Sequence, residues 1–84
     1  SDKKKQKEIE NLQRQVQQLQ RSYTNLKDAM DKAYDTTSLI EYRKEMEKNL
    51  DAQIASYQAM IAAENTASAF ITHATLVHLP PRFQ

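Results

Sequence analysis

Residues 9–33 read IENLQRQVQQLQRSYTNLKDAMDKA and carry an apolar side chain at every third or fourth position. The steps between successive members of this heptad seam are 3, 4, 3, 4, 3, 4 and 3, and the members are Ile9, Leu12, Val16, Leu19, Tyr23, Leu26, Met30 and Ala33. Such spacing is the a/d pattern of a heptad repeat, and its persistence over about four heptads indicates a helix that packs in a coiled coil. The flanking positions are mostly uncharged, so they leave the partner and the helix orientation open.

Residues 35–38, which read DTTS, interrupt this pattern. Side chains of this kind bond to their own backbone and favour turns and helix starts over helix interiors. Ser38 and Glu41 have the spacing of a capping box, in which the hydroxyl and the carboxylate each accept a hydrogen bond from a backbone N–H at the helix start. The segment therefore predicts the end of one helix and the start of another. One continuous helix is the alternative, because no glycine or proline precedes Pro80.

We predict an all-α fold with a single helical domain over residues 1–84. Its parts are a first helix over about 3–34, a break over 35–38, a second helix over about 39–67 and a tail over 68–84. At 1.5 Å per residue the two helices are about 48 and 42 Å long. Matched lengths and a short break favour an antiparallel two-helix hairpin of the coiled-coil type.

The second helix is expected to carry an apolar stripe with a period of 11 residues. The members of this stripe are Leu39, Met46, Leu50, Ile54, Tyr57 and Ile61. An 11-residue period corresponds to about 3.67 residues per turn, which is close to a straight helix. In the predicted hairpin the stripe packs against the heptad seam from Ile9 to Met30.

Charged residues are concentrated in the first part of the chain. Residues 49–84 contain only Asp51, Glu64 and Arg82 as charged residues, together with eight alanines. A helix that is small and uncharged on most sides is usually surrounded by protein, which two helices alone do not provide. An isolated hairpin of this size is also marginally stable. We therefore expect a homo-oligomer, a complex with a helical protein partner in a larger assembly, or both.

The composition gives little support for catalysis or metal binding. The 84 residues include no cysteine and no glycine, which excludes disulfides, thiol nucleophiles, cysteine-based zinc sites and glycine-rich phosphate loops. His73 and His78 are about 140° apart on a helix, so they do not form a metal-binding i, i+4 pair. A hairpin also offers no cleft for a nucleophile, a base and a carboxylate. We expect no enzymatic activity, no cofactor, no metal and no small-molecule substrate.

A run of lysines lies near the start of the chain, at Lys3, Lys4, Lys5 and Lys7. Clustered cations are suited to contact phosphate groups or an acidic surface. Glu8 follows at once, however, and the formal net charge is only +1, so a solvated helix start is the favoured interpretation.

The C-terminal tail contains a proline pair within Leu79, Pro80, Pro81, Arg82 and Phe83. The residue before a proline is restricted to extended conformations, so these residues leave the helix. An extended Pro-Pro segment is suited to dock in an aromatic-lined groove on a partner, although a complete PxxP core is absent. Residues 68–79 fit either a helix or an extended segment.

Residues 59–79 are too polar to predict a membrane-spanning helix, since they include Glu64 and both histidines. No apolar stretch follows the first residues, so we expect no signal peptide and a cytoplasmic location. The sequence favours a non-enzymatic helical interaction protein that acts by coiled-coil association as an assembly, scaffold or chaperone-like subunit of a larger complex. Two alternatives stay open: a nucleic-acid-associated accessory protein that uses the lysine run, and an adaptor that presents the LPPRF tail.

Overall fold

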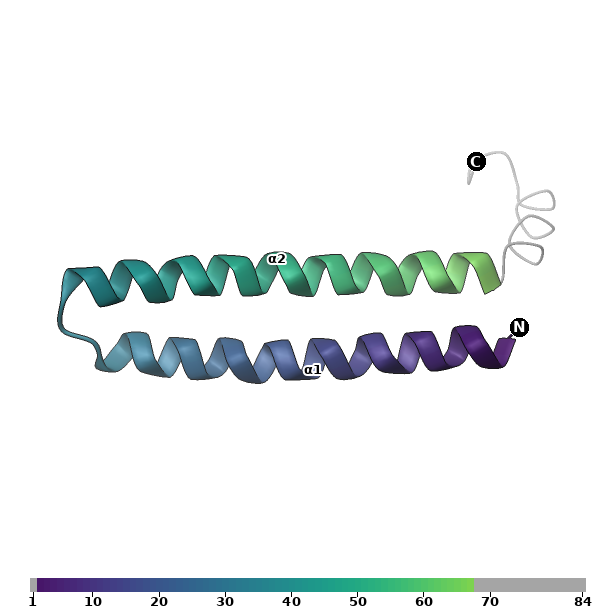
Figure 1. The fold of residues 1–84 in the computed structure, drawn as a ribbon, viewed down its shortest axis with the longest axis horizontal. Coiled ribbons are helices and arrows are strands. Elements are labelled where there is room, and N and C mark those ends of the chain that lie inside the picture. Colours follow the sequence, from purple (N-terminus) through teal and green to yellow (C-terminus); the bar gives the residue numbers. More distant parts are fainter. Residues whose placement is uncertain (1, 68–84) are drawn as a thin grey trace, which may run out of the picture.

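The computed structural model describes residues 2–67, which form two α-helices packed against each other (Figure 1). Helix α1 spans Asp2–Lys32 and helix α2 spans Thr36–Ala67. The two helices lie side by side, run in opposite directions and are joined by a short connection (Figure 1). The described part of the chain is therefore an all-helical hairpin, and the alternative of one continuous helix is wrong.

Asp35 sets the start of α2. Its carboxylate Oδ2 accepts a hydrogen bond of 2.8 Å from the backbone N–H of Ser38, and its carbonyl accepts one of 3.2 Å from the N–H of Leu39. These are the bonds of an N-cap residue. The hydrogen bonds from Ser38 hold the pKa of the Asp35 carboxyl below its ordinary value. Ser38 therefore lies inside the first turn, and the capping box predicted from Ser38 to Glu41 is wrong.

The connection between the helices is consequently earlier than expected. Residues 33–35 lie outside both helices, whereas the sequence predicted a break over 35–38. The N–H of Ala33 bonds to the carbonyl of Met30 at 3.2 Å and closes the end of α1. Asp and Ser are about equally common as N-cap residues, so residue type alone does not distinguish Asp35 from Ser38.

Helix α1 packs on α2 through the heptad seam. Val16 is buried with 5% of its surface exposed, and the other seven seam residues are half-buried. Every other described residue of α1 is exposed, apart from Lys5 and Ala29. The seam is thus a continuous stripe along the side of α1 that faces its neighbour.

Helix α2 packs on α1 through a set of residues that shares only Leu39 and Met46 with the expected stripe. Its buried and half-buried positions include a second 3, 4 series, made of Leu39, Tyr42, Met46, Asn49, Gln53, Ser56, Met60 and Ala63. Asn49, Ser56 and Ala63 are the most buried, each with 8% of its surface exposed. Both helices therefore present a 3.5-residue period to each other, which keeps two faces in contact along their whole length.

The predicted 11-residue stripe lies only in part on the face of α2 toward α1, since Leu39 and Met46 belong to that face and the other four members do not. Leu50, Ile54, Tyr57 and Ile61 are 42%, 54%, 46% and 57% exposed. A stripe of about 3.67 residues per turn drifts around the helix relative to a seam of 3.5 residues. It starts on the packing face at Leu39 and has left that face by Leu50.

Candidate interaction surfaces

A polar network lies in the middle of the interface between the helices. The side-chain amide Nδ2 of Asn49 donates a hydrogen bond of 2.9 Å to the backbone carbonyl of Leu19 on α1. Its Oδ1 accepts one of 2.7 Å from Nε2 of Gln53. Within the described residues, no buried side-chain nitrogen or oxygen lacks a partner. Because Asn49 bonds to one particular carbonyl of the other helix, it fixes how far α2 is shifted along α1.

The interior of the hairpin is small and partly polar as a result. Val16 and Ala63 are the buried apolar residues among those described, and Asn49 and Ser56 are the buried polar ones. Asn49, Gln53 and Ser56 are absent from the predicted interface, because that prediction followed the large apolar residues. The signal that identifies them is the continuation of the 3, 4 spacing through polar positions.

The large apolar residues of α2 lie on its outside instead. We name this surface the outer stripe, and it consists of Ile40, Leu50, Ile54, Tyr57 and Ile61. Ile40 is 49% exposed, and the other four have the exposures given above. Each member lies one residue after a buried or half-buried position, so the outer stripe is turned by about 100° from the face toward α1. Arg43 and Glu47 occupy the same side between Ile40 and Leu50.

The outer stripe borders α1 along an uncharged strip of that helix. A surface depression of about 490 Å³ is lined by Tyr57 and Met60 of α2 together with Gln13, Val16, Gln17 and Gln20 of α1. These three glutamines therefore lie on the same side of the hairpin as Tyr57.

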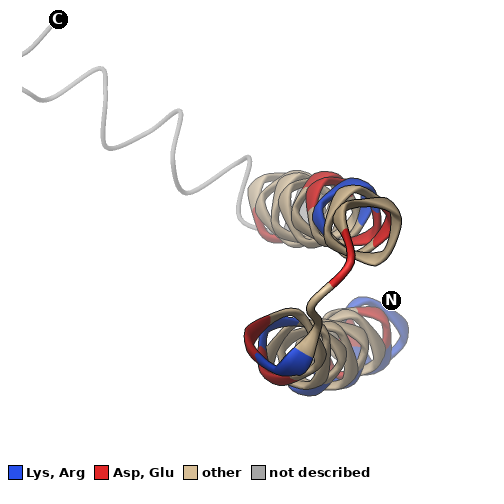
Figure 2. Cartoon of the chain, turned by 90° about the vertical axis from the view of Figure 1, so that its left-hand side faces the viewer, with Lys and Arg blue, Asp and Glu red and all other residues tan. Residues whose placement is uncertain are grey.

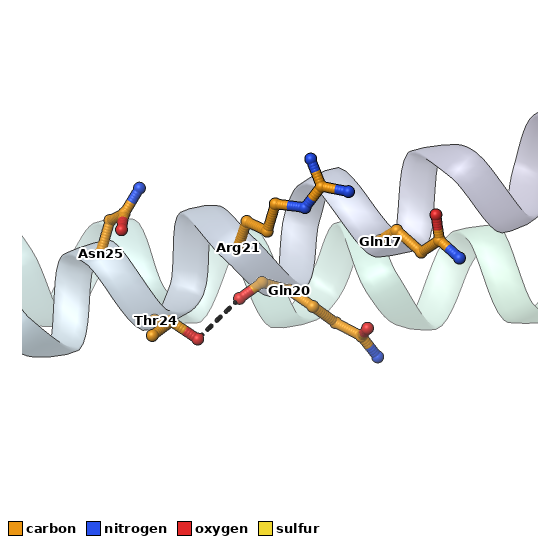
Figure 3. Close-up of a pocket in the computed structure, with 5 residues that line it drawn as sticks. All are labelled: Gln17, Gln20, Arg21, Thr24 and Asn25. Atoms are coloured by element: carbon orange, nitrogen blue, oxygen red, sulfur yellow. Dashed lines mark hydrogen bonds between the residues drawn. The ribbon is translucent and has the colours of Figure 1, made fainter.

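A second depression, of about 430 Å³, continues along α1 from Gln17 and Gln20 to Thr24 (Figure 3). The Thr24 hydroxyl donates a hydrogen bond of 3.0 Å to the carbonyl of Gln20. Arg21 and Asn25 line its other edge and point to the opposite side of α1 from Gln20 and Thr24 (Figure 3). Gln13, Gln17 and Gln20 thus form an uncharged strip beside Tyr57, and the depression that continues from this strip along α1 is lined by Arg21 as well as by Thr24.

A further depression, of about 530 Å³, lies at the end of the hairpin near the connection. Its walls include Met30 of α1 and Leu39, Ile40, Arg43 and Glu47 of α2. It extends the outer stripe toward the start of α2 and combines apolar walls with two cations, Arg43 and Lys44, and one anion, Glu47.

The charged residues form exposed pairs on the surface. Lys32 contacts Asp28 at 2.9 Å, and this hydrogen bond raises the pKa of Lys32. Lys48 lies 3.7 Å from Glu45. All four side chains are more than half exposed, and exposed pairs of this kind contribute little to stability. In Figure 2 the charge on α2 is concentrated near the connection, and its far half is mostly uncharged.

The other predicted binding features are placed as follows. Lys3, Lys4 and Lys7 are exposed and Lys5 is half-buried, all in the first turns of α1. The tail residues Leu79, Pro80, Pro81, Arg82 and Phe83 lie outside the described residues, as do His73 and His78. Within residues 2–67, no group of three or more His, Cys, Asp or Glu side chains is placed to hold a metal ion. Neither described helix combines the length and the apolar character that crossing a membrane requires.

No protein-family model, no curated protein and no solved structure matches this chain. The surfaces of the hairpin are therefore the basis for a functional interpretation.

Proposed function

We propose that this chain is a non-enzymatic helical interaction protein, which acts by coiled-coil association as an assembly, scaffold or chaperone-like subunit of a larger complex. The observation that carries the proposal is the position of the outer stripe. Its large apolar side chains are about half exposed, while the face of α2 toward α1 contains Asn49, Gln53 and Ser56. From Leu50 to Ile61 the outer stripe is uninterrupted, and an exposed apolar patch on a small protein marks a contact surface.

The energetics of a lone hairpin support the same proposal. In a lone hairpin Leu50, Ile54, Tyr57 and Ile61 leave about half of their surface in water. Covering this surface is favourable, because burial of apolar surface contributes about 25 cal/mol per Å². The observed arrangement is favourable when a further helix covers the outer stripe, since binding then stabilises the folded form.

The proposal is tested by isolating the tagged full-length chain from its source and measuring the mass of its complexes by native mass spectrometry. We expect complexes of fixed stoichiometry that are heavier than the 9.7 kDa chain. Ile54→Glu should abolish them, because it places a charge in the outer stripe. Ala55→Glu is the matched control, since Ala55 is exposed on another side of the same helix. Complexes that survive Ile54→Glu, or a chain that always runs alone, would contradict the proposal.

A further inference from the structure

We propose that the outer stripe of α2 packs against the outer stripe of a second copy of this chain, with the two α2 helices antiparallel, so that two hairpins form a four-helix bundle. This inference rests on the proposed function and specifies the partner. It follows from the geometry, area, polarity and residue order of one face of the hairpin.

The geometry of α2 is that of a helix with two neighbours. Its face toward α1 and its outer stripe both follow heptad-like spacing and are offset by one residue, which is about 100° around the helix. In a four-helix bundle each helix contacts two adjacent helices, and a square arrangement places those contacts about 90° apart. The hairpin already supplies one neighbour of α2, and a second copy supplies the other.

The exposed area supplies most of what a specific dimer interface requires. The four members from Leu50 to Ile61, which the register below pairs with one another, are between 42% and 57% exposed. With large side chains of about 200 Å² each, they expose roughly 400 Å² per copy. Two copies thus remove about 800 Å² from water, and the neighbouring strip of α1 supplies the rest of the about 1,000 Å² that a specific interface buries.

The polarity of the face permits contact with its own copy. Beside Tyr57 of the outer stripe, α1 presents Gln13, Gln17 and Gln20, which carry no charge. A strongly charged strip at this place would meet an identical charge in a symmetric dimer and repel it. Neutral amides can instead hydrogen-bond to one another across the interface.

Residue matching selects one of the two symmetric arrangements. If the twofold axis is parallel to the helices, α2 of one copy lies over α1 of the other, and the outer stripe is covered by glutamines. If the axis is perpendicular to the helices, α2 lies over α2 and α1 over α1. The second arrangement places apolar residues on apolar residues and amides on amides, and so avoids burying unpaired amide groups against hydrocarbon.

The order of residues along the stripe then fixes the register. In an antiparallel heptad pairing, Leu50 faces Ile61 of the second copy and Ile54 faces its Tyr57, with each pair occurring twice. All four central layers are therefore apolar. Glu47 of each copy faces Glu64 of the other just outside these four layers, which is an unfavourable like-charge contact that solvent screening weakens. A shift by seven residues would place Ile61 opposite Arg43, which is less favourable.

The first experiment measures the mass of the purified full-length chain by sedimentation equilibrium over a range of concentrations, with helix content followed by circular dichroism. We expect a mass of twice 9.7 kDa. Ile54→Glu should raise the dissociation constant of the dimer by about a hundredfold or more, because each dimer loses two buried isoleucines. The control Ala55→Glu should leave the dissociation constant nearly unchanged. Equal effects of the two variants would overturn the proposal.

A second experiment remains informative if Ile54→Glu fails to fold. The sequence contains no cysteine, so Leu50→Cys and Ile61→Cys each introduce a unique thiol. We expect a disulfide-linked dimer when the two variants are mixed, equilibrated and oxidised, and little linked dimer from either variant alone. Identical thiols would be 11 residues apart along the helix, about 16 Å, which exceeds the reach of a disulfide. Efficient linkage of Leu50→Cys alone would overturn the antiparallel pairing.

The outcomes separate this inference from the proposed function. A chain that stays at 9.7 kDa at every concentration overturns the homodimer. The proposed function survives that result if Ile54→Glu still removes the chain from its complex in the source. Absence of both the homodimer and the native complex would overturn both.

Discussion

Replacing Asn49 by alanine removes a side chain that joins the two helices in the middle of the hairpin. Asn49 is 8% exposed, donates to the carbonyl of Leu19 at 2.9 Å and accepts from Gln53 at 2.7 Å. Each such hydrogen bond contributes about 1 kcal/mol net. We therefore expect Asn49→Ala to lower the free energy of unfolding by about 2 kcal/mol. Urea titrations followed by circular dichroism, at one fixed protein concentration, measure this change.

A double-mutant cycle separates the two bonds of Asn49. The single variants Asn49→Ala and Gln53→Ala, and the double variant, should show a coupling of about 0.5–1 kcal/mol, because the residues contact each other directly. Asn49→Leu tests whether the polar character of this side chain matters, since it replaces a satisfied polar group by an apolar group of similar size. We expect it to recover much of the lost stability and to relax the register between the helices. An Asn49→Ala variant within 0.5 kcal/mol of the unchanged chain would refute the reasoning.

Three further changes test other parts of the hairpin. Val16→Ala should lower the free energy of unfolding by about 2 kcal/mol in urea titrations, because Val16 is the most buried apolar residue described. The lowered pKa of Asp35 implies stability that is complete above the pKa of an unfolded carboxyl, near 4, and is lost as the pH falls through the lower folded value. The urea midpoint should therefore fall with pH in that range, and less so in Asp35→Asn. Lys3→Gln with Lys7→Gln should slightly raise helix content by circular dichroism, since cations oppose the helix dipole at an N-terminus, and should leave the oligomeric mass unchanged.

The helical hairpin itself was predictable because its signals are local. The heptad seam of α1 stands out, since large apolar residues alternate there with glutamines and charges. In the structure, each of these apolar residues is buried or half-buried. The connection was predictable to within about three residues, and the error arose because several neighbouring side chains can cap a helix.

The packing face of α2 was not predictable by following hydrophobicity alone. Hydrophobicity directs attention to Leu50, Ile54 and Ile61, which the structure leaves on the outside. The face toward α1 instead uses Asn49 and Ser56, whose small or hydrogen-bonded side chains suit a neighbouring helix. A single apolar pattern therefore does not identify the packing face of a helix that has two apolar or partly apolar sides.

The two sides of α2 have different roles in the proposed dimer: one selects the register within the hairpin, and the other provides apolar surface for association. The face toward α1 contains a buried amide that bonds to one carbonyl, which selects a register but contributes little apolar burial. The outer stripe has large apolar side chains and no comparable amide, so in the proposed dimer it supplies the free energy of association. If two copies pair in this way, folding and association form a single linked equilibrium. The unfolding midpoint of the unchanged chain should consequently rise with protein concentration, whereas that of Ile54→Glu should not.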